Sequence, residues 1–204
     1  QIQDHVKKLF RKNTMEPFSH GEYISDSAFY SSLADLVATK AVVSDSDCLY
    51  LSHNWKNESR SAEYMAKLLS SGPRFRDGLG SFVGEFEAAK GVQLSPEQKQ
   101  AFMLLEDSRA CVVSGFPGTG KTLLISAFVH LFERLNLHYV LMSPTGIAAK
   151  RLSQMTGKPA STIHRALGFK RDGTWEFNAD NKYSVDAVIV DEMSMVDAAT
   201  FYRL

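Results

Sequence analysis

The sequence predicts an α/β fold with a parallel sheet, and three observations carry this prediction. Short apolar runs with the composition of buried strands occur at Ala110–Ser114, Tyr139–Ser143 and Ala187–Val190. A helical pattern lies between the first and second of these runs, as a helix that connects parallel strands does. Turn-forming or acidic residues follow each run directly. These residues lie at the carboxyl ends of the predicted strands, which is the edge of an open α/β sheet where ligands bind.

The composition is that of an ordinary globular chain, with 204 residues and 44% hydrophobic content. The formal net charge is zero, which argues against a grip on nucleic acid through bulk charge but allows a local basic patch. Cys48 and Cys111 suggest neither a disulfide framework nor a metal site, so we expect a reducing, cytoplasmic compartment. Neither a membrane-spanning run nor a leader is recognisable, so we expect no membrane contact. The chain starts at Gln1 rather than methionine, which we interpret as a piece of a longer protein.

The sequence pattern of the first part of the chain predicts a small helical module. Apolar spacing predicts helices at Ile2–Phe10 and Asp26–Lys40, followed by a hairpin of Val42–Val43 and Cys48–Leu51. A helix followed by a hairpin resembles a winged helix, which would either touch DNA with its wing or only pack. We favour packing, because the hairpin tip at Ser44–Asp47 carries two acids where phosphate contact would need Lys or Arg.

A linker separates this module from the rest. A helix is expected at Asn57–Leu69, and the stretch Ser70–Gly80 is rich in Gly, Pro and Ser. Another helix through Phe82–Phe86 ends at Gly91, and the next opens with Ser95 as its N-cap. We therefore expect a helical, winged-helix-like module at 1–72, a linker and connecting helix at 73–93, and the start of the α/β domain at 94–204.

The stretch Gly115–Thr122 matches the phosphate-binding pattern G-x-x-x-x-G-K-[ST]. A predicted strand precedes it and a predicted helix of residues 123–132 follows, as the motif requires. Lys121 would contact the β- and γ-phosphates of ATP, and the Thr122 hydroxyl would bind Mg²⁺. The alternative is a glycine-rich turn that matches by accident. The expected nucleotide-binding residues of the loop are Gly115, Pro117, Gly118, Thr119, Gly120, Lys121 and Thr122.

Two adjacent acids follow the last predicted strand. Asp191 would hold Mg²⁺, and Glu192 would orient and deprotonate the attacking water. We therefore expect Lys121, Asp191 and Glu192 to be the catalytic residues, with Thr122 and Asp191 at the metal. Asp197 is expected to start the next helix, Ala198–Leu204.

The segment 145–171 contains six basic residues and no acid. A solvated basic face is the usual meaning of such a run. Its position just after a strand end, in a nucleotide-binding domain, favours a nucleic-acid backbone as the partner.

Four segments together resemble the motor of RecD-like DNA helicases of superfamily 1. They are Leu94–Ala101 with Gln98, Gly115–Thr122, Pro144–Ser153 continuing to Ser161–Gly168, and Val188–Asp197. The resemblance is specific from Leu94 onward. Residues 25–90 are more loosely similar to the small module that precedes the motor in these enzymes.

The resemblance implies a P-loop, RecA-like fold and an ATP-dependent helicase that moves 5′ to 3′ on single-stranded DNA. Gln98 would read the adenine. The residues that the resemblance and the basic run place near DNA are Thr145, Gly146, Lys150, Arg151, Thr162, His164 and Arg165. Such enzymes serve DNA repair and recombination, and subunits of a nuclease complex or a single-strand-binding protein are further candidate partners.

One departure from the family pattern is large, because the second motor domain would lie beyond Leu204. An arginine supplied across the cleft of related hydrolases is worth about 10³- to 10⁵-fold, so we expect the chain to bind Mg-ATP but hydrolyse it poorly. Two alternatives stay open: a P-loop ATPase that remodels protein, and a winged-helix DNA-binding regulator with a nucleotide-sensing pocket.

Overall fold

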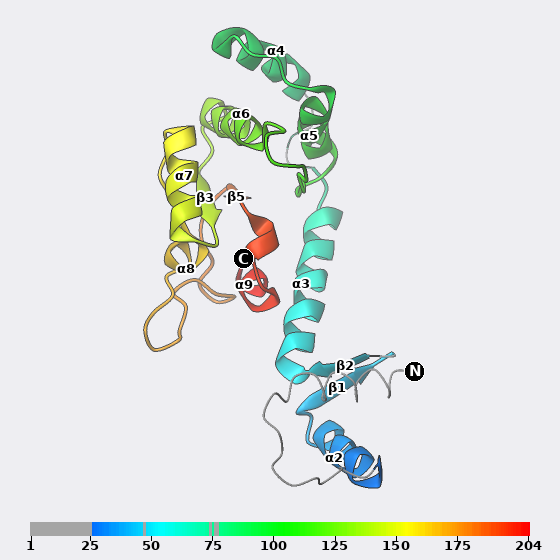
Figure 1. Cartoon of the computed structure of the whole chain (residues 1–204). Helices are drawn as coiled ribbons and strands as arrows, with labels where there is room; N and C mark the ends of the chain where they lie inside the picture. Colours follow the sequence, from blue (N-terminus) through cyan, green and yellow to red (C-terminus); the bar gives the residue numbers. More distant parts are fainter. Residues whose placement is uncertain (1–25, 47, 74, 76–77) are drawn as a thin grey trace. The chain divides into compact units, whose positions relative to one another are not determined.

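The structure is a computed structural model of the 204-residue chain, and it describes residues 26–46, 48–73, 75 and 78–204 (Figure 1). The chain forms two compact units, Gln1–Ser59 and Arg60–Leu204. The helix expected at Ile2–Phe10 lies outside the described residues. None of the helices in the described ranges is long and apolar enough to cross a membrane.

The first unit contains a helix and a β-hairpin, as predicted. α2 (Asp26–Ala38) leads into β1 (Val42–Asp45) and β2 (Cys48–Leu51), which pair antiparallel. The indole nitrogen of Trp55 donates to the Asp45 carboxylate at 3.1 Å. One acid of the hairpin tip is thus engaged by the protein itself. This contact supports packing as the role of the hairpin, which stays a prediction.

α3 (Ser52–Ser70) begins five residues before the helix expected at Asn57–Leu69. The backbone amide of Ser52 donates to the Ala41 carbonyl at 3.1 Å, directly after β2 ends. α3 therefore starts directly after the second strand of the hairpin ends. Apolar spacing did not indicate this start, because the first turn of α3 is mostly polar.

Three helices of the second unit pack around an aromatic core. They are α4 (Leu79–Lys90), α5 (Pro96–Asp107) and α6 (Lys121–Arg134). The side chains of Phe86 and Phe102 are buried, and the Phe102 ring lies 4.5 Å from that of Phe128. Two predicted helix ends are confirmed: Gly91 ends α4 in a left-handed conformation, and Ser95 caps α5.

The sheet of the second unit is parallel and has the strand order β4-β3-β5. β3 (Tyr139–Ser143) and β5 (Ala187–Val190) have the predicted bounds. α7 (Gly146–Thr156) connects β3 to β4 (Ala160–Thr162), and the short α8 (Ile163–Ala166) follows. The sequence pattern did not indicate β4 or α8, since three and four residues are too few for a periodicity.

The chain continues after β5 through η1 (Met193–Met195) to α9 (Ala198–Arg203). Asp197 is the N-cap of α9, as predicted, and its carboxylate accepts from the Thr200 amide at 2.7 Å. The core covers both faces of the sheet. Leu141 packs with Val129 of α6 on one face, and Met142 packs with Ile163 on the other.

The predicted strand at Ala110–Ser114 is wrong, because the structure assigns none of these residues to a strand. Val112 is 87% exposed. A strand is stable only when its amide and carbonyl groups pair with a neighbour. None of the strands in the described part of the chain pairs with this segment. Its composition suits a buried strand, but composition does not supply a partner.

Glu87 links the end of α4 to the start of α5. Its carboxylate lies 2.9 Å from the Lys99 ammonium and accepts from the Leu94 amide at 2.7 Å. The bond to Lys99, and then the bond to Leu94, lower the pKa of Glu87 from its ordinary value of 4.5. The carboxylate therefore stabilises the fold above pH 4.5, and this contribution is lost as the pH falls through the lower, folded-state pKa.

We expect Glu87→Gln to be less stable than the wild type at pH 7, and the difference to shrink between pH 5 and pH 3. The amide can still accept from Leu94 but carries no charge for Lys99 to bind. Urea unfolding at several pH values measures the difference in the free energy of unfolding. A difference that does not change with pH would contradict this role of the Glu87 charge.

Candidate functional site

The loop Gly115–Thr122 closes on itself by short-range contacts. The Thr119 hydroxyl donates to the Phe116 carbonyl at 2.9 Å. A Cβ added at Gly115 would lie only 2.8 Å from the Thr119 hydroxyl oxygen, so this close approach requires glycine. Gly118 and Gly120 have φ values of +81° and +80°, which other residues rarely adopt. The loop is therefore a tight backbone turn that depends on its glycines.

The side chain of Lys121 bends back over this loop. Its ammonium donates to the carbonyls of Gly115 and Phe116, at 2.6 and 2.9 Å. Lys121 is also the first residue of α6, and its N-cap, Gly120, has no side chain that could cap the helix. The start of a helix is positive and rich in unpaired amides, so it attracts phosphate. A cation and a helix start therefore meet at one loop, a combination that fits a nucleotide phosphate.

Gln98, on α5, forms hydrogen bonds with the glycine loop. Its amide oxygen accepts from the Ser95 backbone at 2.8 Å, which completes the cap of α5. Its amide nitrogen lies 3.2 Å from the carbonyls of Thr119 and Gly120. Gln98 thus lies at the glycine loop, and both ends of its side-chain amide are bonded to protein. Its contact with adenine stays a prediction.

Asp191 and Glu192 follow β5 at the carboxyl edge of the sheet. The Asp191 amide continues the β3–β5 pairing, donating to the Met142 carbonyl at 2.9 Å. The Glu192 amide donates to Asp191 Oδ1 at 3.0 Å, and Glu192 has a φ of +56°. A non-glycine residue in this conformation is uncommon and marks a tight turn directly after β5.

The oxygens of Thr122 and Asp191 are of the hard type that Mg²⁺ prefers. α6 and β5 share a core, because Ile125 and Val129 of α6 belong with Ile189 to one cluster. No group of three or more His, Cys, Asp or Glu in the described ranges is arranged to hold a metal ion. Mg²⁺ usually keeps several waters and takes one or two protein ligands with the phosphates, so two oxygens suit it.

A groove of about 370 Å³ lies along α7, β4 and α8. Four residues predicted to bind DNA line it: Gly146, Lys150, Thr162 and Arg165. Three further polar residues line it that the sequence analysis missed, Ser153, Gln154 and Ser161. Ser153 and Gln154 follow Lys150 at the i+3 and i+4 positions of α7, so helical spacing from Lys150 was the signal that could have found them.

Two threonines cap the helices beside this groove. The Thr145 oxygen accepts from the Ala148 amide at the start of α7, and the Thr162 oxygen accepts from the Arg165 amide at the start of α8, both at 3.2 Å. A hydroxyl has one donor and two acceptor positions. Both threonines therefore keep a hydrogen that can be donated to a phosphate.

The other predicted DNA-binding residues do not line the groove. Arg151 lies on α7 beside Lys150 and is exposed. The His164 ring packs against the rings of Phe169 and Trp175, with centroids 5.2 and 5.1 Å away. The structure thus brings four of the seven predicted residues together in the groove, with Thr145 one residue before Gly146.

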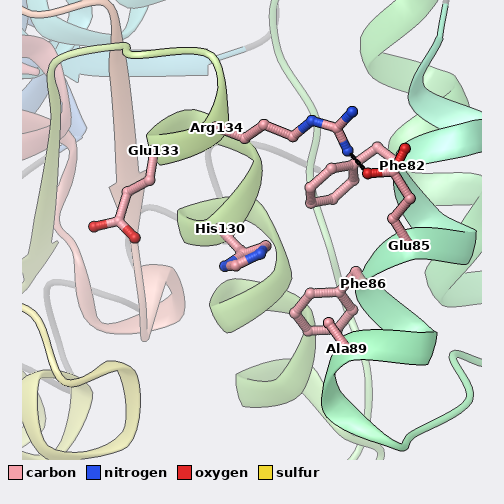
Figure 2. Close-up of a pocket in the computed structure, with 7 residues that line it drawn as sticks. All are labelled: Phe82, Glu85, Phe86, Ala89, His130, Glu133 and Arg134. Atoms are coloured by element: carbon pink, nitrogen blue, oxygen red, sulfur yellow. Dashed lines mark hydrogen bonds and ion pairs between the residues drawn. The ribbon is translucent and has the colours of Figure 1, made fainter.

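A second hollow of about 410 Å³ lies between α4 and α6 (Figure 2). Phe82 and Phe86 face His130 across it, and Arg134 forms an ion pair with Glu85 at its rim. His130 and Arg134 are in the last part of α6, whereas Lys121 is its first residue. The helix rise separates Lys121 and Arg134 by about 20 Å. This hollow therefore lies away from the glycine loop, and none of the predicted site residues lines it.

Residues 98–204 match the family model described as an AAA domain. The chain is 36% identical to the ATP-dependent RecD2 DNA helicase of Deinococcus radiodurans over 169 residues, 83% of this chain and 23% of that protein. It is 30% identical to the RecBCD enzyme subunit RecD of Mycolicibacterium smegmatis, over 78% of this chain and 32% of that protein.

A third relative is the ATP-dependent DNA helicase PIF1 of Trypanosoma brucei brucei, 30% identical over 122 residues, 60% of this chain and 12% of that protein. The chain therefore spans a third or less of the length of these relatives.

Proposed function

Since the chain belongs to the RecD-like DNA helicases of superfamily 1, we propose that it binds Mg-ATP and single-stranded DNA and works within an ATP-dependent 5′–3′ DNA helicase. One observation carries this proposal. The glycine loop and a groove lined by Lys150 and Arg165 occur in one compact unit. The glycine loop leads into α6, and the groove runs along α7. A protein that only remodels protein has no need of the basic groove.

The proposed nucleotide chemistry uses residues at the start of α6 and directly after β5. Lys121 exchanges the carbonyls of Gly115 and Phe116 for the β- and γ-phosphates, which are stronger, charged acceptors. Thr122 and Asp191 would hold Mg²⁺, which neutralises phosphate charge when bound. Glu192, in the turn that follows β5, would orient the attacking water and take its proton.

The proposed contacts with DNA begin where β3 ends. β3 leads through Pro144 and Thr145 into α7, so a shift at this strand end moves the start of α7 and the groove wall. Lys150 and Arg165 neutralise DNA phosphates, and the hydroxyls of Thr145 and Thr162 donate to them. These contacts follow the backbone and read no sequence, which suits a protein that moves along a strand.

We propose slow ATP hydrolysis by this chain alone. The segment that leads into the glycine loop, Ala110–Ser114, has no strand partner among the described residues. Hydrogen bonds of the sheet therefore do not tie the loop to Asp191 and Glu192. Catalysis of phosphoryl transfer depends on positioning, so a loosely held loop supports binding better than turnover.

The partners and the domain organisation are also proposals. One of the relatives named above is a subunit of the RecBCD enzyme, and we propose nuclease-complex subunits or a single-strand-binding protein as partners. We keep the division into 1–72, 73–93 and 94–204. Both cysteines are free, which fits a reducing compartment, and we place the protein in the cytoplasm.

The test is phosphate release from Mg-ATP with and without oligo-dT, after Mg-ADP binding has been confirmed. We expect nucleotide binding, oligo-dT binding that is lost at high salt, and slow release. Nucleotide binding without any oligo-dT binding would favour a protein-remodelling ATPase. DNA binding that localised to residues 25–52 would favour a winged-helix regulator.

A further inference from the structure

Ser143, the last residue of β3, has a fully buried hydroxyl with no hydrogen-bond partner among the described residues. Burying a hydroxyl without a partner destabilises a fold, whereas alanine would fill the same space at no such cost. The hydroxyl therefore gains a role only if a partner reaches it in another state of the protein.

The register of the sheet places Ser143 beside Asp191. Met142 is paired with Val190, and the Asp191 amide donates to the Met142 carbonyl at 2.9 Å. The next residues along the two strands are Ser143 and Asp191. Neighbouring strands lie about 4.8 Å apart, and side chains alternate between the faces of a sheet. Ser143 and Asp191 thus share the face that Leu141 and Ile189 occupy two residues earlier.

That face is the one covered by the start of α6. Leu141 and Ile189 pack with Val129 and Ile125 of α6. Thr122 lies three residues before Ile125, so it occupies the same side of the helix, one turn nearer its start. The Ser143 hydroxyl therefore lies on the face of the sheet that holds both proposed magnesium ligands, Thr122 and Asp191.

We infer that Ser143 is a positioning residue of the magnesium site, whose hydroxyl donates to the Asp191 carboxylate when Mg-nucleotide is bound. The inference rests on the proposed function. Asp191 Oδ1 already accepts from the Glu192 amide at 3.0 Å. A second donor from Ser143 holds the carboxylate in one orientation, so that its free lone pairs face Thr122. Serine and aspartate side chains move between staggered rotamers, and this motion is what would form the bond.

The test is the Mg²⁺ dependence of ADP binding, measured by titration calorimetry at a series of Mg²⁺ concentrations. Ser143→Ala should raise the half-saturating Mg²⁺ concentration about tenfold, as the loss of a hydrogen bond to a charged group does. ADP binding without Mg²⁺ should equal that of the wild type, which also shows that the variant folds. Ser143→Cys, which keeps a weak donor, should fall between the two.

Ser61→Ala is the matched control, because Ser61 on α3 also has a buried hydroxyl without a partner in the described ranges. Its Mg²⁺ dependence should equal that of the wild type. In Asp191→Asn, which lowers the affinity for Mg²⁺ by itself, adding Ser143→Ala should cause little further change, because the two residues act together.

Two results would overturn the inference in different ways. If Ser143→Ala has the wild-type Mg²⁺ dependence while Lys121→Ala loses ADP binding, the nucleotide site stands and the role of Ser143 is wrong. If Lys121→Ala binds Mg-ADP as the wild type does, the proposed nucleotide site is wrong, and the role of Ser143 falls with it.

Discussion

Lys121→Ala is expected to weaken Mg-ADP binding by about 100-fold or more. The ammonium already lies over the loop, 2.6 Å from the Gly115 carbonyl and 2.9 Å from that of Phe116. A bound phosphate replaces these neutral acceptors by charged oxygens. Charge-assisted hydrogen bonds are worth roughly 1.5–3 kcal/mol each, and every 1.4 kcal/mol is about tenfold in affinity. Titration calorimetry with Mg-ADP measures the loss.

Lys158→Ala is the matched control for this variant. It also removes one lysine, but the Lys158 ammonium pairs with Glu133 near the end of α6, away from the loop. Its affinity for Mg-ADP should equal that of the wild type, and both variants should unfold cooperatively. Undiminished binding by Lys121→Ala would count against the whole assignment of the glycine loop.

The double variant Lys150→Ala/Arg165→Ala is expected to lose on the order of 100-fold in affinity for oligo-dT at low salt. Both cations line one groove, where the hydroxyl of Thr162 can donate to a phosphate of the same DNA strand. Each lost phosphate contact should lower the slope of log affinity against log salt by about 0.7 for a single strand, or about 1.4 for two. Fluorescence anisotropy at four or five salt concentrations measures both quantities.

Lys170→Ala/Arg171→Ala is the control for the groove. It removes the same charge from the same basic segment, 145–171, but neither residue lines the groove. We expect only a small, salt-sensitive loss and a nearly unchanged slope. Equal losses in both double variants would mean that the basic segment acts as a diffuse charged face and that the groove is not the binding site.

Much of the fold was predictable, because local rules decide many of its elements. β3 and β5 have the predicted bounds, because each is a short apolar run bounded by turn signals and the two runs pair with each other. The cap of α5 at Ser95 is equally local, because its bonds join residues three apart. The glycine loop and the acid pair at Asp191 were visible for the same reason, as residue types at fixed short spacing.

Long-range pairing explains what the sequence analysis missed. Ala110–Ser114 has the composition of a strand but pairs with none of the described strands. β4 is only three residues long and is held by its register with β3, where Ser143 is opposite Thr162. Gln98 was expected at the adenine, and only the folded chain shows that its amide reaches the carbonyls of Thr119 and Gly120.

By itself, the sequence determined which groups lie close together along the chain: a glycine loop with Lys121, two acids after an apolar run, and a basic segment without acids. These features depend on residue types within short stretches, which a chain carries whether or not it is folded. The tertiary structure alone decided which of them meet. It placed Lys150 and Arg165 in one groove with Gln154, left His164 among aromatic rings, and set the buried Ser143 hydroxyl beside Asp191. Strand register and helix packing join residues far apart in the chain, and local spacing contains no information about either.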